Sequence, residues 1–119
     1  MAGNMNWLDT VRIELDGTAV NYDYVTTRGF EITDVIAHGV NTVGAATAQL
    51  NRATAAAPTV FNTISSVLAV DTEDDIEYTT VITTAQQTLG TGDVLRVVTA
   101  NVPIGDVFVD LIPATWIAG

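Results

Sequence analysis

Few residues in this chain can take part in chemistry. The sequence has no lysine, no cysteine and one histidine, His38, against fourteen Asp and Glu residues. It therefore offers no thiol nucleophile, no amine for a Schiff base and no group of histidines for a metal. The two serines, Ser65 and Ser66, stand in no motif that marks a nucleophile. We therefore expect no enzymatic activity, no catalytic residue, no metal site and no cofactor.

Carboxylates are abundant, and glycosidases use two of them as acid and base. Fourteen acidic residues guarantee that some pair lies at a suitable distance, so the presence of a pair is no evidence for that reaction. His38, next to Gly39, could act as a general base or a metal ligand. No accompanying motif supports either role. We favour a histidine at the end of a strand, in a turn.

Five carboxylates fall within the stretch 71–77. They are Asp71, Glu73, Asp74, Asp75 and Glu77. Clustered oxygen ligands suit Ca²⁺, but the spacing lacks the residue order of an EF-hand loop. We favour a solvated acidic loop, since runs of like charge usually face solvent. Whether this loop binds Ca²⁺ stays open.

Residues 89–98 read Leu-Gly-Thr-Gly-Asp-Val-Leu-Arg-Val-Val and superficially resemble a phosphate-binding loop. The Lys-Ser/Thr ending of such a loop is absent, and a strand pattern follows in place of a helix. The segment therefore predicts a tight turn before a strand.

Strands must position these side chains, because hydrophobic residues recur with a period of two over most of the chain. Val, Ile and Thr, which favour strands, number sixteen, nine and nineteen of the 119 residues. The alternation predicts that ten apolar side chains are mostly buried, and that Val81, Val94 and Val98 are more exposed. The ten are Val11, Ile13, Phe30, Ile32, Ile82, Leu95, Val97, Val107, Val109 and Leu111.

Two early segments are distinctive. Asp16-Gly17 stands between alternating stretches and predicts a β-hairpin. Residues 45–57 are rich in alanine, which favours a helix. However, Ala46, Ala48 and Leu50 alternate with polar residues, so we favour a strand of small residues.

Later segments are less regular. Residues 59–70 fit either one short helical turn or a strand with a bulge. Residues 76–84 predict a strand with Ile76, Tyr78, Thr80 and Ile82 on one face. Pro113 ends the last strand.

About eight short strands separated by turns indicate an all-β fold, an antiparallel, jelly-roll-like β-sandwich. At 119 residues the chain predicts a single domain, with residues 1–6 as a loose arm and 113–119 as a tail. The first residues lack a basic segment followed by an apolar one, so we expect no signal peptide. No apolar run reaches the roughly 18 residues of a spanning helix.

The net charge of −10 limits the partners. Four scattered arginines (at 12, 28, 52 and 96) form no basic stripe for a phosphate backbone, so we expect no nucleic acid as partner. The same charge disfavours an anionic membrane surface. Without lysines to protect sheet edges, we expect neighbouring subunits to cover them, as a dimer or trimer.

From Phe30 onward, several segments occur in a familiar order. Ile32-Thr-Asp-Val-Ile36 is followed by the small-residue strand, Thr63-Ile-Ser-Ser-Val-Leu68, the acidic loop and Thr88-Leu-Gly-Thr-Gly-Asp-Val-Leu-Arg-Val-Val98. Over about residues 30–112 the chain resembles the small head decoration, or cement, proteins of tailed bacteriophages. The most specific part of this resemblance is the Gly-Asp-Val-Leu-Arg-Val turn and strand. No family motif defines functional residues, so none carries over.

The resemblance implies a structural virion protein, made in the host cytoplasm, that binds the outer surface of a phage head and bridges neighbouring capsomers. Its partners would be the major capsid protein and copies of itself. A charge of −10 agrees with a place outside the shell, away from packaged DNA. The alternative is a carbohydrate-binding sandwich associated with a phage tail or fibre. The small aromatic content favours decoration.

Two tryptophans lie near the ends of the chain, Trp7 and Trp116. Each could close the core, and each could equally anchor an interface. We therefore treat Trp7, Trp116 and the neighbouring Ile117 as candidate contacts with the shell.

Overall fold

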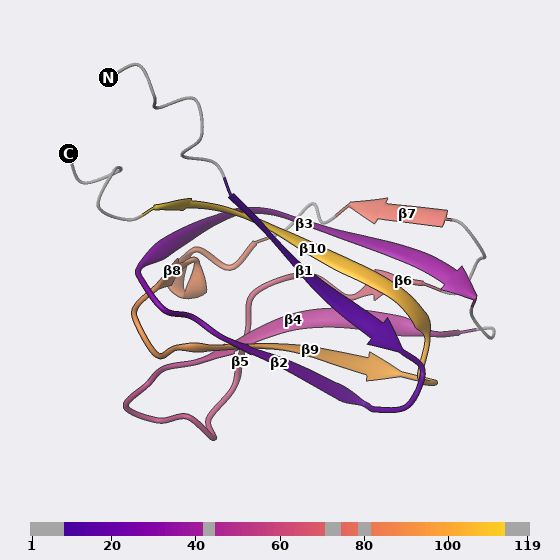
Figure 1. Cartoon of the computed structure of the whole chain (residues 1–119), viewed down its shortest axis with the longest axis horizontal. Helices are drawn as coiled ribbons and strands as arrows, with labels where there is room; N and C mark the ends of the chain where they lie inside the picture. Colours follow the sequence, from indigo (N-terminus) through magenta and orange to yellow (C-terminus); the bar gives the residue numbers. More distant parts are fainter. Residues whose placement is uncertain (1–8, 42–44, 71–74, 79–81, 114–119) are drawn as a thin grey trace, which may run out of the picture.

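The computed structural model describes residues 9–41, 45–70, 75–78 and 82–113 (Figure 1). These residues form ten strands and one short 3₁₀ helix, η2 (Thr84–Gln86), with no α-helix among them. The strands are β1 (Asp9–Asp16), β2 (Asn21–Val25), β3 (Phe30–Asn41), β4 (Thr47–Ala53), β5 (Asn62–Thr63), β6 (Leu68–Ala69), β7 (Asp75–Tyr78), β8 (Thr88–Leu89), β9 (Val94–Ala100) and β10 (Ile104–Pro113).

The strands form two antiparallel sheets that pack face to face, as Figure 1 shows. The first sheet has the order β1-β10-β3-β7, and β8 pairs with the other end of β3. The second sheet has the order β2-β9-β4-β5, and β6 also pairs with β4. The fold is therefore all-β and an antiparallel sandwich, as the spacing of strands predicted.

The strands pair from the two ends of the chain inward. The first strand pairs with the last (β1 with β10), and the second pairs with the one before it (β2 with β9). Further in, β3 pairs with β7 and β8, while β4 pairs with β5 and β6. The strands from β1 to β4, and again β8, β9 and β10, alternate between the two sheets, while β4–β6 stay in the second sheet and β7 and β8 in the first. This nested pairing is the jelly-roll arrangement.

One hydrophobic core fills the space between the sheets. Eight of the ten side chains that the alternation assigned to it are buried, namely Ile13, Phe30, Ile32, Leu95, Val97, Val107, Val109 and Leu111. Val11 and Ile82 are partly buried and pack against it. Val94 and Val98 are more exposed than their neighbours, as predicted, and Val81 lies outside the described residues.

The predicted hairpin at Asp16-Gly17 is wrong. Gly17 does adopt a left-handed φ of 80°, which a tight turn requires. However, β1 pairs with β10 and β2 pairs with β9, so the turn carries the chain from one sheet to the other. Pairing with a distant strand allows the apolar faces of β1 and β2 to face each other across the core.

The ambiguous segments resolve as short strands. Residues 47–53 form β4, as the alternation favoured over a helix. Residues 59–70 contain β5 and β6. Of the strand expected over 76–84, β7 contains the residues up to Tyr78, Thr80 lies outside the described residues, and Ile82 makes a single bridge to Ser65. The shared face predicted for Ile76, Tyr78 and Ile82 is wrong, because Ile76 and Tyr78 are exposed on the outer side whereas Ile82 packs against the core.

Candidate functional site

The outer face of the first sheet carries the most varied group of side chains in the described structure. Paired residues in adjacent strands share a face, so the registers define rows across the sheet. One row runs Arg12, Phe108, Ile36 and Tyr78, from β1 to β7. The next row runs Glu14, Asp106, His38 and Ile76. The face is thus charged at β1 and apolar at β7.

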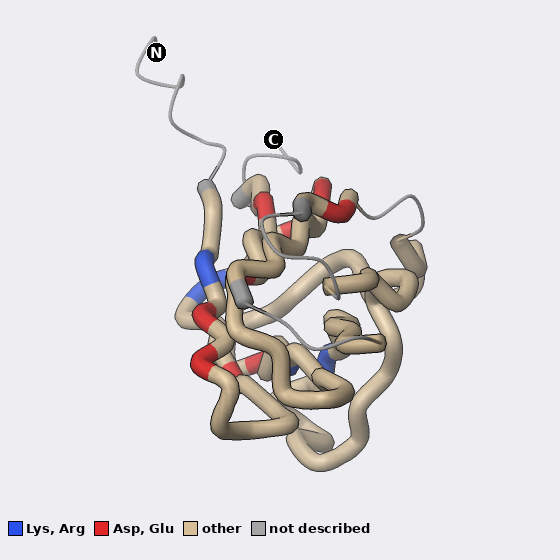
Figure 2. The backbone as a smooth tube through the Cα atoms, turned by 90° about the vertical axis from the view of Figure 1, so that its right-hand side faces the viewer, with Lys and Arg blue, Asp and Glu red and all other residues tan. Residues whose placement is uncertain are grey.

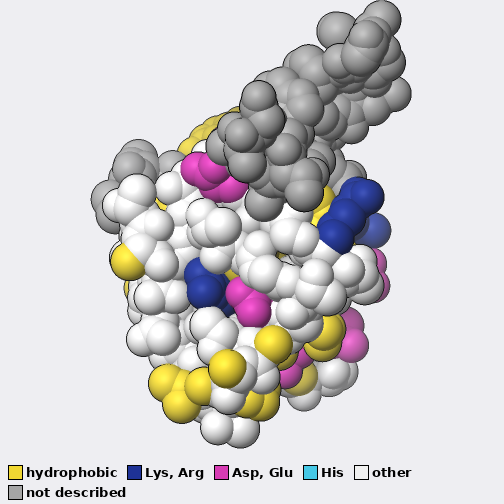
Figure 3. Space-filling view, turned by 90° about the vertical axis from the view of Figure 1, so that its left-hand side faces the viewer, with side chains coloured by type: hydrophobic (Ala, Val, Ile, Leu, Met, Phe, Trp, Pro, Cys, Tyr) yellow, Lys and Arg dark blue, Asp and Glu magenta, His cyan; other side chains and the backbone are white. Residues whose placement is uncertain are grey.

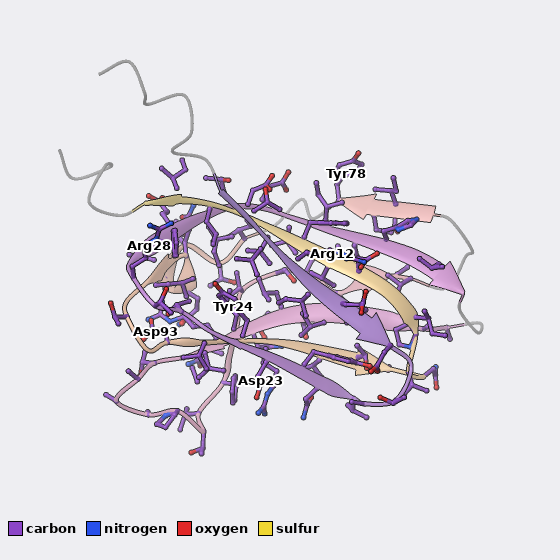
Figure 4. The ribbon with its side chains drawn as sticks, in the orientation of Figure 1. Arg12, Asp23, Tyr24, Arg28, Tyr78 and Asp93 are labelled. Atoms are coloured by element: carbon purple, nitrogen blue, oxygen red, sulfur yellow. The ribbon has the colours of Figure 1, made fainter. Side chains whose placement is uncertain are left out.

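Four side chains make up the apolar part, which we call the apolar band: Ile36, Ile76, Tyr78 and Phe108. Ile76 is 48% exposed and Tyr78 is 62% exposed, while Ile36 and Phe108 are half-buried. Tyr78 points away from the sandwich on the outer side of β7 (Figure 4). Because the core lies on the opposite face, folding of the single chain leaves this band in contact with water.

A charged cluster borders the band on the side of β1. The Nε of Arg12 donates to Oδ1 of Asp106 at 2.7 Å, and its Nη2 donates to Oε2 of Glu14 at 3.0 Å. The hydrogen bond to Asp106 raises the pKa of Arg12 above its ordinary value. His38 Nδ1 lies 3.7 Å from Oδ2 of the same Asp106. Asp106 therefore sits between two groups of opposite charge to its own when His38 is protonated.

Beside this cluster the surface is hollowed. The depression has a volume of about 360 Å³ and is lined by Arg12, Glu14, Asp106, Leu15 and Ile104, among others. Small-molecule sites start at roughly 300 Å³, so this is a small one. Its charged groups already satisfy one another, so the depression fits a protruding side chain of a partner better than a reacting substrate.

His38 does not lie at a strand end in a turn, because β3 continues to Asn41. Its ring is half-buried on the outer face, beside Asp106. Ser65 Oγ, the nucleophile that a catalytic histidine would need, instead donates to the Ser66 carbonyl and accepts the Leu50 N–H. Ser65 is thus engaged in backbone hydrogen bonds of the second sheet, whereas His38 lies on the outer face of the first.

The acidic stretch is only partly visible. Asp71, Glu73 and Asp74 lie outside the described residues, and Asp75 and Glu77 belong to β7. Within the described part of the chain, no group of three His, Asp or Glu side chains is arranged to hold a metal ion. The possibility of a Ca²⁺ loop stays untested, since most of its ligands fall outside that part.

The glycine-rich segment is a tight turn before β9, as predicted. Its aspartate has a role that sequence reasoning missed. Asp93 is buried and accepts the backbone N–H of Gly90 at 2.8 Å and of Ala55 at 3.0 Å. Arg52 Nε lies 3.5 Å from Asp93 Oδ2. Arg52 shares the inward parity of Leu50 on β4, and this parity is the signal that could have identified it.

Two further features mark the second sheet. On its outer face Arg96 donates two hydrogen bonds to Asp23, at 2.7 and 2.9 Å, and covers the ring of Phe61 at 3.9 Å. The loop before β5 exposes Ala55, Ala56, Pro58 and Val60. Figure 3 shows hydrophobic side chains gathered at this end of the molecule. They form a smaller apolar area without exposed aromatic rings.

Trp7, Trp116 and Ile117, the candidate shell contacts, lie outside the described residues, as do residues 1–6 and most of the expected tail. Their role stays a prediction. No family model matches the chain, and no curated protein or solved structure matches it either. None of the helical residues that the structure describes forms a segment able to cross a bilayer.

Proposed function

We propose that this protein is a structural component of a phage virion that binds the outside of the head and stabilises contacts between capsomers. The observation that carries the proposal is the apolar band on the outer face of the first sheet. An exposed apolar patch with a polar border often marks a surface that binds another protein. Aromatic residues such as Tyr78 are also enriched among the residues that dominate binding energy.

The composition supports the same assignment. A net charge of −10 suits a protein on the outside of a DNA-filled shell and disfavours one in contact with the DNA. The jelly-roll sandwich is an architecture that capsid proteins use. The major capsid protein would be the partner, and the apolar band would be the surface that it covers.

The described aromatic residues also favour decoration over sugar binding. A sugar-binding sandwich would present aromatic rings at its loop tips. In the described part of the chain, Phe30 is buried, Tyr22 and Tyr24 pack against the core, and Phe61 lies beneath Arg96. Tyr78 is well exposed, but it lies on a strand.

Cosedimentation with empty phage heads that lack the protein tests the proposal. The double variant Ile76→Ser/Tyr78→Ala should bind the heads at least about tenfold more weakly, the loss expected when one dominant contact is removed. Val25→Ser is the matched control, because Val25 is a β-branched residue on an edge strand of the other sheet and is 56% exposed. It should bind like the unmodified protein.

Salt separates apolar from charged contacts. Raising NaCl to about 0.5 M should change the bound fraction little, since salt screens exposed ion pairs and not apolar burial. Normal binding of the double variant together with release by salt would assign the contact to charged groups. Absence of binding to heads, with binding to an array of glycans, would replace the proposal by the sugar-binding alternative.

A further inference from the structure

The strand β1 leaves one long edge of the first sheet open. β1 pairs with β10 on one side over all eight residues, without a register shift. No other described strand pairs with its second side. β1 contains no proline, glycine or lysine, the residues that commonly prevent an edge from pairing.

The other free edges are shorter. β7 has four residues and β2 has five. At the centre of β2 lies Asp23, so pairing of two copies about that centre would bring two carboxylates together. Longer strands form more backbone hydrogen bonds, and like charges directly opposite each other destabilise a sheet. Among the described edges, β1 is therefore the best suited to pair with another strand.

The sequence of β1 is complementary to itself when the second strand runs antiparallel. Ile13 and Leu15 face the core, and Val11 packs against it. On the outer face, Arg12 and Glu14 occupy alternate positions (Figure 2). Turning a second copy about a two-fold axis through Ile13 places Arg12 opposite Glu14 of that copy, and the reverse. The inward residues then meet as Ile13 with Ile13 and Val11 with Leu15.

We propose that two copies of this protein associate through β1, antiparallel and centred on Ile13, so that their first sheets become one continuous sheet. The two Arg12–Glu14 pairs across the axis select this register. A shift by one residue would turn the apolar side chains of one copy toward solvent. A shift by two residues in one direction places Arg12 opposite Arg12. The shift in the other direction keeps Arg12 opposite an acid, Asp16, but places Glu14 opposite Glu14, a repulsive contact that the register centred on Ile13 avoids.

The charges of the monomer fit this arrangement. Each chain carries a net charge of −10, so copies repel unless a cation lies at the contact. Arg12 provides that cation. In the monomer its Nε donates to Asp106 of β10 and its Nη2 to Glu14 of the same chain, so pairing across the open edge exchanges this Glu14 for that of the second copy. The side chain of Arg12 is 56% exposed and that of Glu14 is 67% exposed, so both can reach a second strand. The dimer does not require the phage head.

Disulfide trapping tests the register. Because the chain has no cysteine of its own, any disulfide must form between the introduced cysteines. Directly opposite residues in antiparallel strands lie close enough for a disulfide bond. Under mild oxidation Ile13→Cys should form a covalent dimer on a non-reducing gel. Val11→Cys is the control, since in this register Val11 faces Leu15 and the two new thiols lie far apart. Equal cross-linking of both variants, or of neither, would overturn the register.

A second variant tests dimerisation without replacing a core residue. Glu14→Arg places two arginines opposite each other at both pairs, so dimerisation should weaken at least about tenfold in sedimentation equilibrium. Glu31→Arg makes the same change of charge on the outer side of β3, away from β1, and should leave dimerisation intact. A purely monomeric unmodified protein, at the concentrations used for trapping, would refute the proposal. Neither assay contains phage heads, so failure here is distinct from failure of the proposed function.

Discussion

The Nε of Arg52 lies 3.5 Å from Oδ2 of Asp93, and both side chains are largely buried at one end of the sandwich. Arg52 also donates from Nη1 to the carbonyl oxygens of Gln86 and Thr88. Arg52 thus links β4 of the second sheet to β8 of the first sheet and to η2, the short helix that precedes β8. Asp93 in addition accepts the backbone N–H of Gly90, in the turn before β9, and that of Ala55, in the loop after β4.

Removing Asp93 should therefore be costly. Asp93→Ala leaves the guanidinium of Arg52 buried without its carboxylate, and breaking a buried pair in this way costs about 3–5 kcal/mol. The free energy of unfolding, measured with urea, should fall by this amount. Asp23→Ala removes the partner of Arg96, a more exposed arginine, and should cost about 1 kcal/mol or less. Equal effects of the two substitutions would contradict the structural role of Asp93.

Gly105 should tolerate no side chain. A Cβ at this position would lie 2.0 Å from the carbonyl oxygen of His38, where β10 and β3 change register. The three nearest atoms are all backbone atoms of His38 and Gly39, which cannot move aside as a flexible side chain can, so Gly105→Ala should lower the free energy of unfolding by about 3 kcal/mol or more. At Gly90 the nearest atoms to an added Cβ are 3.9 Å away, and Gly90→Ala serves as the control. A stable Gly105→Ala protein would show that the close approach is wrong.

Stability should decrease in acid through two carboxylates. Hydrogen bonds from Arg96 lower the pKa of Asp23, and a hydrogen bond from the Thr18 side chain lowers the pKa of Asp16. Each pKa is lower in the folded protein than in the unfolded one, where it is close to 3.8, so the ionised carboxylates stabilise the fold at a pH above 3.8. This contribution is lost as the pH falls through the folded-state pKa. Urea midpoints should therefore stay level between about pH 7 and 5 and drop below about pH 4.

Asp23→Asn separates one of these contributions. Its urea midpoint should be lower than that of the unmodified protein at neutral pH, because the charged partner of Arg96 is gone. The difference between the two proteins should shrink as the pH falls through the pKa of Asp23. A difference that stays constant down to about pH 2 would show that the carboxylate does not titrate as its hydrogen bonds indicate.

For β1, β9 and β10 the sequence by itself determined which side of the strand faces the core, whereas on β7 the apolar Ile76 and Tyr78 face outward. Ile13, Leu95 and Val109 could be assigned from alternation, because in a strand the direction of a side chain depends only on its position along the chain. The same reasoning identified β4 as a strand despite its alanines. It also predicted the tight turn before β9, because Gly and Asp adopt turns through local interactions.

Only the tertiary structure decided which strands pair and which charges meet. Asp16-Gly17 has the local signal of a hairpin, yet β1 pairs with β10. Arg12 and Asp106, which are bonded across these two strands, are 94 positions apart in the sequence. That choice depends on burying the apolar faces of all strands at once, which no local pattern contains. For the same reason the Arg52–Asp93 pair and the apolar band appear only when the sheets are assembled, since their members come from separate strands and turns.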